Sequence, residues 1–251
     1  MEKIKILILN LVFYVMFFVF SITSIPLMAL LGLLSSLVFS KRVVLRRWRK
    51  AISWYGKIVI YFLPFPFVQV KYDDLSNRKE KGPFIIICNH RAASDPFLMA
   101  CLPYEECIQI VNIWPFKIPL IGWGAKMAGY LSVKEMPFEN FLQKTTKLIE
   151  EKVNIISFPE GTRSNGKEMK QFYSSIFRVA IKNKCSIVPL CISGNEKIPA
   201  KGTGILQPGI IKLRRLPALR WEDYKDCSPF ILKNRVRDII KKELEQMDCG
   251  I

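Results

Sequence analysis

The chain has 251 residues, half of them hydrophobic, and a formal net charge of +17 at pH 7. A charge of this size predicts an anionic partner, and because no nucleic-acid-binding motif accompanies it, we expect an anionic phospholipid surface and no nucleic acid. His90 is the only histidine and the seven cysteines form no C-x-x-C pair. A histidine-rich metal centre is therefore excluded, and neither a zinc site nor a disulfide framework is indicated.

An uncharged segment occupies residues 6–40. As one straight helix it would extend about 52 Å, far more than the roughly 30 Å hydrocarbon core of a bilayer. We expect the helix to break at residues 21–26, because Pro26 removes a backbone donor. The prediction is a hairpin of two short helices, 6–20 and 27–39, that enters one leaflet. A single tilted span and a cleaved signal peptide are the alternatives.

The next segment, residues 41–62, is basic and amphipathic. Apolar residues recur there at helical spacing, with arginines and lysines between them. We expect a helix that lies on an anionic membrane surface, or one that packs on the protein with its charged face in solvent. Basic residues flank the apolar segment on both sides, which places both of its ends on the cytoplasmic face of the membrane. Residues 1–62 are thus predicted to be a membrane anchor, and residues 63–251 a single domain.

The rest of the chain alternates strand and helix signals. Apolar runs predict strands near residues 84–88, 106–112, 130–134, 153–158, 186–192 and 209–215. Helical periodicity is found in residues 138–152 and 228–247. This pattern predicts an α/β fold, a mixed central sheet flanked by helices, preceded by the membrane-embedded two-helix segment.

A polar motif follows the predicted strand 84–88. It reads Asn89-His90-Arg91-Ala92-Ala93-Ser94-Asp95-Pro96, with Asp95 as the candidate N-cap of a helix and Pro96 at its first position. One interpretation is structural: Asp95 caps a helix and His90 is a loop residue. The other is chemical, since an imidazole that titrates near neutral pH and is oriented by a carboxylate is a common general base.

A second polar motif, Phe158-Pro159-Glu160-Gly161-Thr162-Arg163, begins where the predicted strand 153–158 ends. Arg163 offers a two-pronged donor to an anion, and Gly161 allows the backbone to approach a ligand closely. An anion-binding loop is therefore predicted, with a solvated turn as the alternative.

Together the two motifs resemble those of the glycerolipid acyltransferase family, which includes the 1-acyl-sn-glycerol-3-phosphate acyltransferases. Asn89-His90 with Asp95 matches the family's NHxxxxD motif, and residues 158–163 match its FPEGTR motif letter for letter. Two further blocks match more loosely, at residues 116–119 with 129–134 and at residues 187–190. The resemblance covers about residues 80–215.

The resemblance implies the transfer of a fatty acyl group from acyl-CoA or acyl carrier protein to the sn-2 hydroxyl of lysophosphatidic acid, which forms phosphatidic acid. His90 would be the general base, and Asp95 would orient its ring. The acceptor would be bound by Glu160, Gly161, Thr162, Arg163 and Lys134. No metal or cofactor is implied besides the acyl donor, and residues 63–251 would be the catalytic domain.

Departures from the family pattern leave the acceptor open. Lys134 stands where the family usually has arginine, which keeps the charge but loses the fork geometry. Residues 171–175 lack a glycine that many relatives carry, so another lysophospholipid or an acylated aminolipid is an alternative acceptor. Residues 113–124 are expected to line an acyl channel or to pack in the core. A lipid hydrolase, which would need a G-x-S-x-G motif, and a non-catalytic lipid-binding module are the rival classes.

Overall fold

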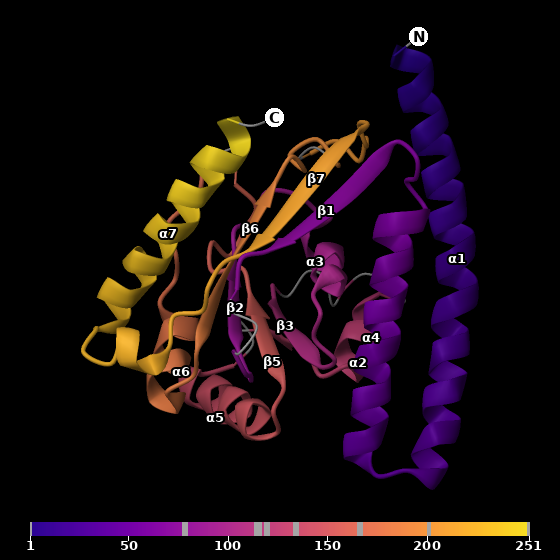
Figure 1. Ribbon diagram of the computed structural model, residues 1–251. Helices are drawn as coiled ribbons and strands as arrows, with labels where there is room; N and C mark the ends of the chain where they lie inside the picture. Colours follow the sequence, from indigo (N-terminus) through magenta and orange to yellow (C-terminus); the bar gives the residue numbers. More distant parts are fainter. Residues whose placement is uncertain are drawn as a thin grey trace.

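The computed structural model describes residues 2–76, 80–112, 117, 121–132, 136–164, 168–199 and 202–249. Figure 1 shows two parts that lie side by side, a pair of long N-terminal helices and a domain built on one sheet. The C-terminal helix lies on the side of the sheet away from the N-terminal pair. The arrangement therefore separates the apolar N-terminal segment from the C-terminal layer of the domain.

The N-terminal helix α1 is continuous from Glu2 to Val38. The predicted break at residues 21–26 is wrong, because the helix runs through Pro26. The hydroxyls of Ser21 and Ser24 donate to the carbonyl oxygens of Phe17 and Phe20, one turn earlier, at 2.5 and 2.6 Å. Both polar side chains are therefore hydrogen-bonded within the apolar helix. Packing against a neighbouring helix allows an apolar helix to tolerate proline.

The reversal of the chain lies instead at residues 39–40, and α2 (Lys41–Lys57) runs back along α1 (Figure 1). The hairpin is thus made of α1 and the amphipathic helix. Tyr55 stacks on Phe20 with ring centroids 5.2 Å apart, and its hydroxyl lies 2.8 Å from that of Ser21. Gly32 lies so close to the indole of Trp48 that a Cβ there would collide with it. Close packing against α2 therefore holds α1 straight.

Most of α1 nevertheless faces outward. Only Leu9, Ser21, Ser24 and Ile25 of this helix are buried, and many of its leucine, valine and phenylalanine side chains are exposed. By length and composition, α1 is the one helix among the described residues that is long and apolar enough to cross a membrane.

Asn10 attaches α1 to the sheet domain. Its side chain exchanges two hydrogen bonds with the backbone of Leu206, at 2.8 and 2.9 Å.

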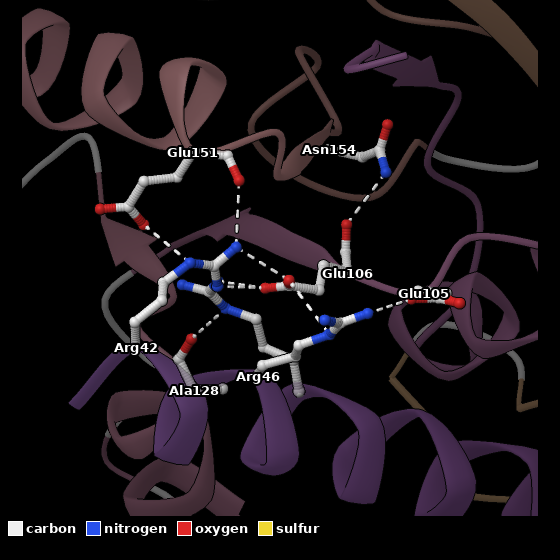
Figure 2. Close-up of polar contacts among 8 residues, drawn as sticks. Arg42, Arg46, Glu105, Glu106, Ala128, Glu151 and Asn154 are labelled. Carbon is white, nitrogen blue, oxygen red and sulfur yellow. Dashed lines mark hydrogen bonds and ion pairs between the residues drawn. The ribbon is translucent and has the colours of Figure 1, made fainter. Parts of the chain in front are cut away.

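Arginines of α2 dock this helix onto the sheet domain (Figure 2). The side chain of Arg49 is only 2% exposed and pairs with Glu106 at 2.9 Å, while its Nε donates to the carbonyl oxygen of Ala128. Arg42 grips both oxygens of Glu106 at 2.5 and 2.8 Å and also donates to the backbone of Glu151. Part of the basic face of α2 is therefore turned into the protein, which neither interpretation of residues 41–62 anticipated.

The sheet has seven strands in the order β1-β7-β6-β2-β5-β3-β4. These are β1 (Val68–Asp74), β2 (Ile85–Cys88), β3 (Cys107–Val111), β4 (Leu131–Ser132), β5 (Asn154–Ser157), β6 (Ile187–Ser193) and β7 (Gly209–Arg215). The β6 and β7 strands pair antiparallel, whereas all other neighbours pair parallel. The predicted mixed sheet is confirmed, and six of its strands lie within a few residues of the predicted ranges.

Helices cover both faces of this sheet (Figure 1). The helices that pack on one face are α5 (Phe138–Glu150), α6 (Ser175–Asn183) and α7 (Pro229–Cys249). The other face is covered by α3 (Asp95–Leu98), by the short helix η2 (Met99–Cys101) and by η1 (Ile58–Phe62), a π-helical turn that extends α2. Two further short helices are α4 (Ile121–Met127) and η5 (Trp221–Asp223). Because both faces are covered, β2 is wholly buried, and its all-apolar sequence is typical of such strands.

Candidate active site

The carboxyl ends of β2, β5 and β6 lie next to one another, because these strands pair parallel in the centre of the sheet. In open α/β sheets this edge is where ligands bind. Asn89, the first residue after β2, locks the register there: its side-chain amide donates to Ile192 O at 2.9 Å and its oxygen accepts from Ile192 N at 2.8 Å. His90, the next residue, therefore lies at a fixed position beside the end of β6.

His90 and Asp95 meet directly. The Nδ1 of His90 lies 2.6 Å from Oδ2 of Asp95. The carboxylate is fully buried, while the imidazole side chain is 18% exposed. Since a carboxylate accepts, Nδ1 carries the proton and Nε2 presents a lone pair. Among the described residues none bonds to Nε2, so the basic nitrogen is available to a substrate. The pair predicted from the motif is thus brought together in the geometry of a general base and its orienting acid.

Asp95 does not cap a helix. It is the first residue of α3, not the residue before it, so the expected N-cap assignment is wrong. Its Oδ2 turns back and accepts from the backbone N–H groups of Arg91 and Ala92, at 2.7 and 3.0 Å, besides His90. The carboxylate thus closes the turn that carries the imidazole and also holds the imidazole ring.

Glu160 lies beside His90 and is 3% exposed. Its two oxygens accept from the backbone N–H groups of His90, at 2.7 Å, and Lys170, at 2.9 Å. Burial raises the pKa of Glu160 above its ordinary value, although these two backbone bonds oppose the rise. The loop is further tied down by Ser164 N, which donates to His90 O at 2.8 Å. In this geometry Glu160 joins the two motifs and fixes the backbone of the histidine.

The residues of the FPEGTR segment that follow Glu160 are more exposed than Glu160 itself. Gly161 has a φ of +70°, and a Cβ there would press on the exposed ring of Tyr173 at 2.8 Å, so both backbone and space favour glycine. Thr162 accepts a hydrogen bond from Nζ of Lys170 at 2.8 Å. Arg163 is partly exposed in the same loop. Hydroxyl, ammonium and guanidinium side chains therefore belong to the segment after β5, in which Glu160 and Ser164 bond to the backbone of His90. An anionic headgroup is bound by donors of this kind.

Lys134 lies outside the described residues, as does most of the segment expected to line an acyl channel, residues 113–116 and 118–120. Sequence reasoning missed two residues that the structure places at the site, Lys170 and Asn195. Lys170 follows the FPEGTR motif by seven positions and its sequence neighbourhood gave no signal. Asn195 lies 100 residues from Asp95, whose Oδ1 accepts from its Nδ2. Only the pairing of β6 with β2 brings this asparagine to the site.

Cys88 is the nearest thiol to the motif, and it is buried in β2 with its Sγ 3.6 Å from the sulfur of Met99. Burial raises the pKa of the Cys88 thiol well above its ordinary value. A protonated thiol in an apolar strand is a poor nucleophile. This agrees with a reaction in which the substrate, and not the protein, supplies the nucleophile.

Comparison with known proteins identifies the class. The family model described as "Acyltransferase" matches residues 69–193, which include both motifs, and the chain belongs to this family. It is 28% identical over 171 residues to the chloroplastic 1-acyl-sn-glycerol-3-phosphate acyltransferase of Arabidopsis thaliana, an alignment that covers 66% of this chain and 48% of the relative. A chloroplastic relative from Brassica napus has the same identity over the same length, with 49% of that relative covered.

The chain thus spans about half the length of these curated relatives. The fold has a solved counterpart over nearly its full length. The crystal structure of the 1-acyl-sn-glycerophosphate acyltransferase PlsC from Thermotoga maritima superimposes with a TM-score of 0.79 at 23% sequence identity, and the alignment covers 98% of each chain. The N-terminal helices are included in this coverage, so the α1–α2 hairpin is part of the shared architecture.

Proposed function

We propose that the protein is an O-acyltransferase that moves a fatty acyl group from acyl-CoA or acyl carrier protein to the sn-2 hydroxyl of 1-acyl-sn-glycerol-3-phosphate, forming phosphatidic acid. The observation that carries the proposal is the contact between His90 and Asp95 at the carboxyl edge of the sheet, 2.6 Å long, with Nε2 left available. The names of the curated relatives support the choice of acceptor.

The reaction follows from these groups. Nε2 of His90 removes the proton of the acceptor hydroxyl while its oxygen attacks the thioester carbonyl carbon. The buried carboxylate of Asp95 stabilises the imidazolium that forms and keeps the ring in place. A C–O bond then forms, the C–S bond breaks, and the proton passes from His90 to the departing thiolate. The proposal calls for no metal and no cofactor besides the acyl donor.

The same loop would bind the acceptor's phosphate. Arg163 and Lys170 supply positive charge, and Thr162 supplies a hydroxyl that Lys170 already contacts. Lys134 remains a proposed phosphate contact on the resemblance alone. Each oxygen of Glu160 accepts from a backbone N–H group, so we assign Glu160 the task of holding His90 and the phosphate loop together, in addition to the contact with the acceptor that the resemblance implies.

We further propose that α1 and α2 attach the enzyme to the cytoplasmic face of a membrane rich in anionic lipid. The net charge of +17 and the exposed apolar face of α1 support this. α1 contacts the rest of the protein at separate points along its length: Asn10 bonds to Leu206, Ser21 bonds to Tyr55, and Gly32 lies against Trp48. A helix held along the domain in this way fits insertion into one leaflet better than a crossing, which would carry one end away from the protein.

The purified protein in lipid vesicles, assayed with acyl-CoA and acyl carrier protein donors against a panel of acceptors, tests the function. We expect lysophosphatidic acid to be acylated with a kcat/KM at least about tenfold above lysophospholipids with larger headgroups, because one exposed phosphate fits the basic loop. If the protein prefers an acylated aminolipid or another lysophospholipid, that lipid replaces lysophosphatidic acid as the proposed acceptor. Release of free fatty acid without ester formation would instead identify a hydrolase.

A further inference from the structure

Asn195 holds the oxygen of Asp95 that faces away from His90. It is fully buried, and its Nδ2 donates to Oδ1 of Asp95. The other oxygen, Oδ2, is shared by His90 and by two backbone N–H groups of the catalytic turn. The carboxylate of Asp95 therefore accepts hydrogen bonds from two separate segments, the turn after β2 and the turn after β6.

The turn after β6 is built to put an asparagine at this point. Gly194 has a φ of +82°, and a Cβ there would collide with the carbonyl oxygen of Ile210, so only glycine fits. The preceding strand is locked to β2 by the paired bonds between Asn89 and Ile192. The next residue, Glu196, forms an ion pair with Arg91 at 2.6 Å. Asn195 is thus fixed on both sides relative to the turn that carries His90.

The amide is used only as a donor. No described residue donates to Oδ1 of Asn195, although this atom is buried. A carboxylate accepts and does not donate, so the bond to Asp95 requires that the NH2 group faces it. Burying an unsatisfied carbonyl oxygen costs free energy that an apolar side chain of similar volume would avoid. Packing alone therefore does not explain an asparagine at this position.

We propose that Asn195 is a positioning residue for acyl transfer: it holds the carboxylate of Asp95 in the orientation that keeps the imidazole of His90 aimed at the acceptor hydroxyl. This inference rests on the proposed function. The titratable and charged groups near the carboxylate are His90, Glu160, the thiol of Cys88 and the Arg91–Glu196 pair, which Asp248 extends at 2.9 Å. Asn195 is the neutral member that completes the contacts of Asp95.

Three variants test the inference. Asn195→Ala should lower kcat by about 10-fold to 100-fold and leave KM for lysophosphatidic acid within about twofold, because the geometry of the base is lost and not the binding of the acceptor. Asn195→Asp should be similarly slow at pH 8 and recover part of its activity relative to the wild type as the pH falls, because two adjacent carboxyls share a proton and regain a donor. Asn154→Ala is the matched control.

Asn154 is also a buried asparagine that bridges two backbone groups, Phe84 N and Glu106 O, but it begins β5 and so lies at the opposite edge of the sheet. Its replacement by alanine should lower the melting temperature without changing the pH profile of kcat. If Asn195→Ala keeps a kcat within twofold of the wild type, or if the pH profile of Asn195→Asp runs parallel to the wild-type profile, Asn195 does not position the acid.

A readout without turnover separates this inference from the proposed function. Because His90 is the only histidine, a protein labelled with 15N-histidine reports one imidazole. We expect Asn195→Ala to shift the Nδ1 proton resonance, which reports the bond to Asp95, and Asn154→Ala to leave it in place. An unshifted resonance would overturn the positioning role. A shifted resonance in a protein whose wild type acylates no acceptor would keep the role and remove the acyltransferase proposal.

Discussion

At the scale of single residues, the proposed chemistry depends on a few side chains from the segments that follow β2, β5 and β6. His90 and Asp95 were predictable because the spacing of the motif places both on one strand-to-helix turn. Glu160 was predictable as a site residue, but its geometry was not. A motif does not reveal that both carboxylate oxygens are already bonded to backbone N–H groups. Lys170 and Asn195 could not be predicted, since folding brings them to the site from positions without a motif.

Arg163 offers a prediction at this scale. Arg163→Ala should raise KM for lysophosphatidic acid by about 10-fold to 100-fold with little change in kcat, because a charge-assisted bond to the phosphate is made equally in the ground and transition states. Steady-state kinetics in mixed micelles measure it. Arg235→Ala, a basic residue on α7, is the control and should leave both constants unchanged. An equal loss with an acceptor that lacks phosphate would show that Arg163 does not bind this group.

At the scale of elements, the sequence predicted those strands and helices whose residues show a clear local hydrophobic pattern. Buried strands such as β2 read as apolar runs, and α5 and α7 showed their helical period, so these elements were found within a few residues. The edge strand β1 was missed although Val68, Val70 and Tyr72 alternate with polar residues, because its partner β7 lies about 140 residues away. The break at Pro26 was wrong because packing against α2 overrides the local preference of proline.

The docking of α2 leads to a prediction about stability. Burial alone would raise the pKa of Glu106, but hydrogen bonds from Arg42 and Arg49 outweigh it and lower this pKa below its ordinary value of 4.5. The stability from these bonds is therefore present above about pH 4.5 and is lost as the pH falls through the lowered pKa. Glu106→Gln should lower the free energy of unfolding by about 3 kcal/mol at pH 7, since it leaves Arg49 buried without its charge partner.

Denaturant unfolding from pH 3 to pH 7 measures this effect. The difference in the free energy of unfolding between the wild type and the variant should become smaller as the pH falls toward 3. Glu105→Gln is the matched control. Its side chain is 82% exposed, and within the described part of the chain it pairs with Arg46 alone, so we expect a change below about 1 kcal/mol. Equal effects of the two substitutions would show that the buried pair does not hold α2 on the sheet.

At the scale of the whole molecule, the proposed function assigns separate tasks to the two parts. The sheet domain carries the residues of the proposed reaction, and the α1–α2 hairpin lies beside it (Figure 1). Most of the exposed large apolar side chains belong to this hairpin. The bonds between Asn10 and Leu206 and the arginines of Figure 2 are among the contacts that join the two parts. An acyltransferase with this arrangement would hold its active site at a constant position relative to a bilayer that contains both acceptor and product.

Flotation with vesicles tests the anchor. The triple variant Leu7→Glu, Phe18→Glu and Leu30→Glu places charges on exposed positions of α1, which are 67%, 65% and 53% exposed. Binding to vesicles that contain anionic lipid should fall at least about tenfold, because each buried charge opposes insertion. Ile231→Glu, at a position 55% exposed on α7, should leave binding unchanged. Wild-type binding by the triple variant would rule out α1 as the anchor.

The central claim is that the imidazole of His90 removes the proton of a lipid hydroxyl. The most direct measurement is the rate of acyl transfer to lysophosphatidic acid by His90→Ala, bound to vesicles and folded as judged by its melting temperature. We predict a rate about 10²-fold to 10⁴-fold below that of the wild type, the usual contribution of a general base. A rate within tenfold of the wild type would contradict the account.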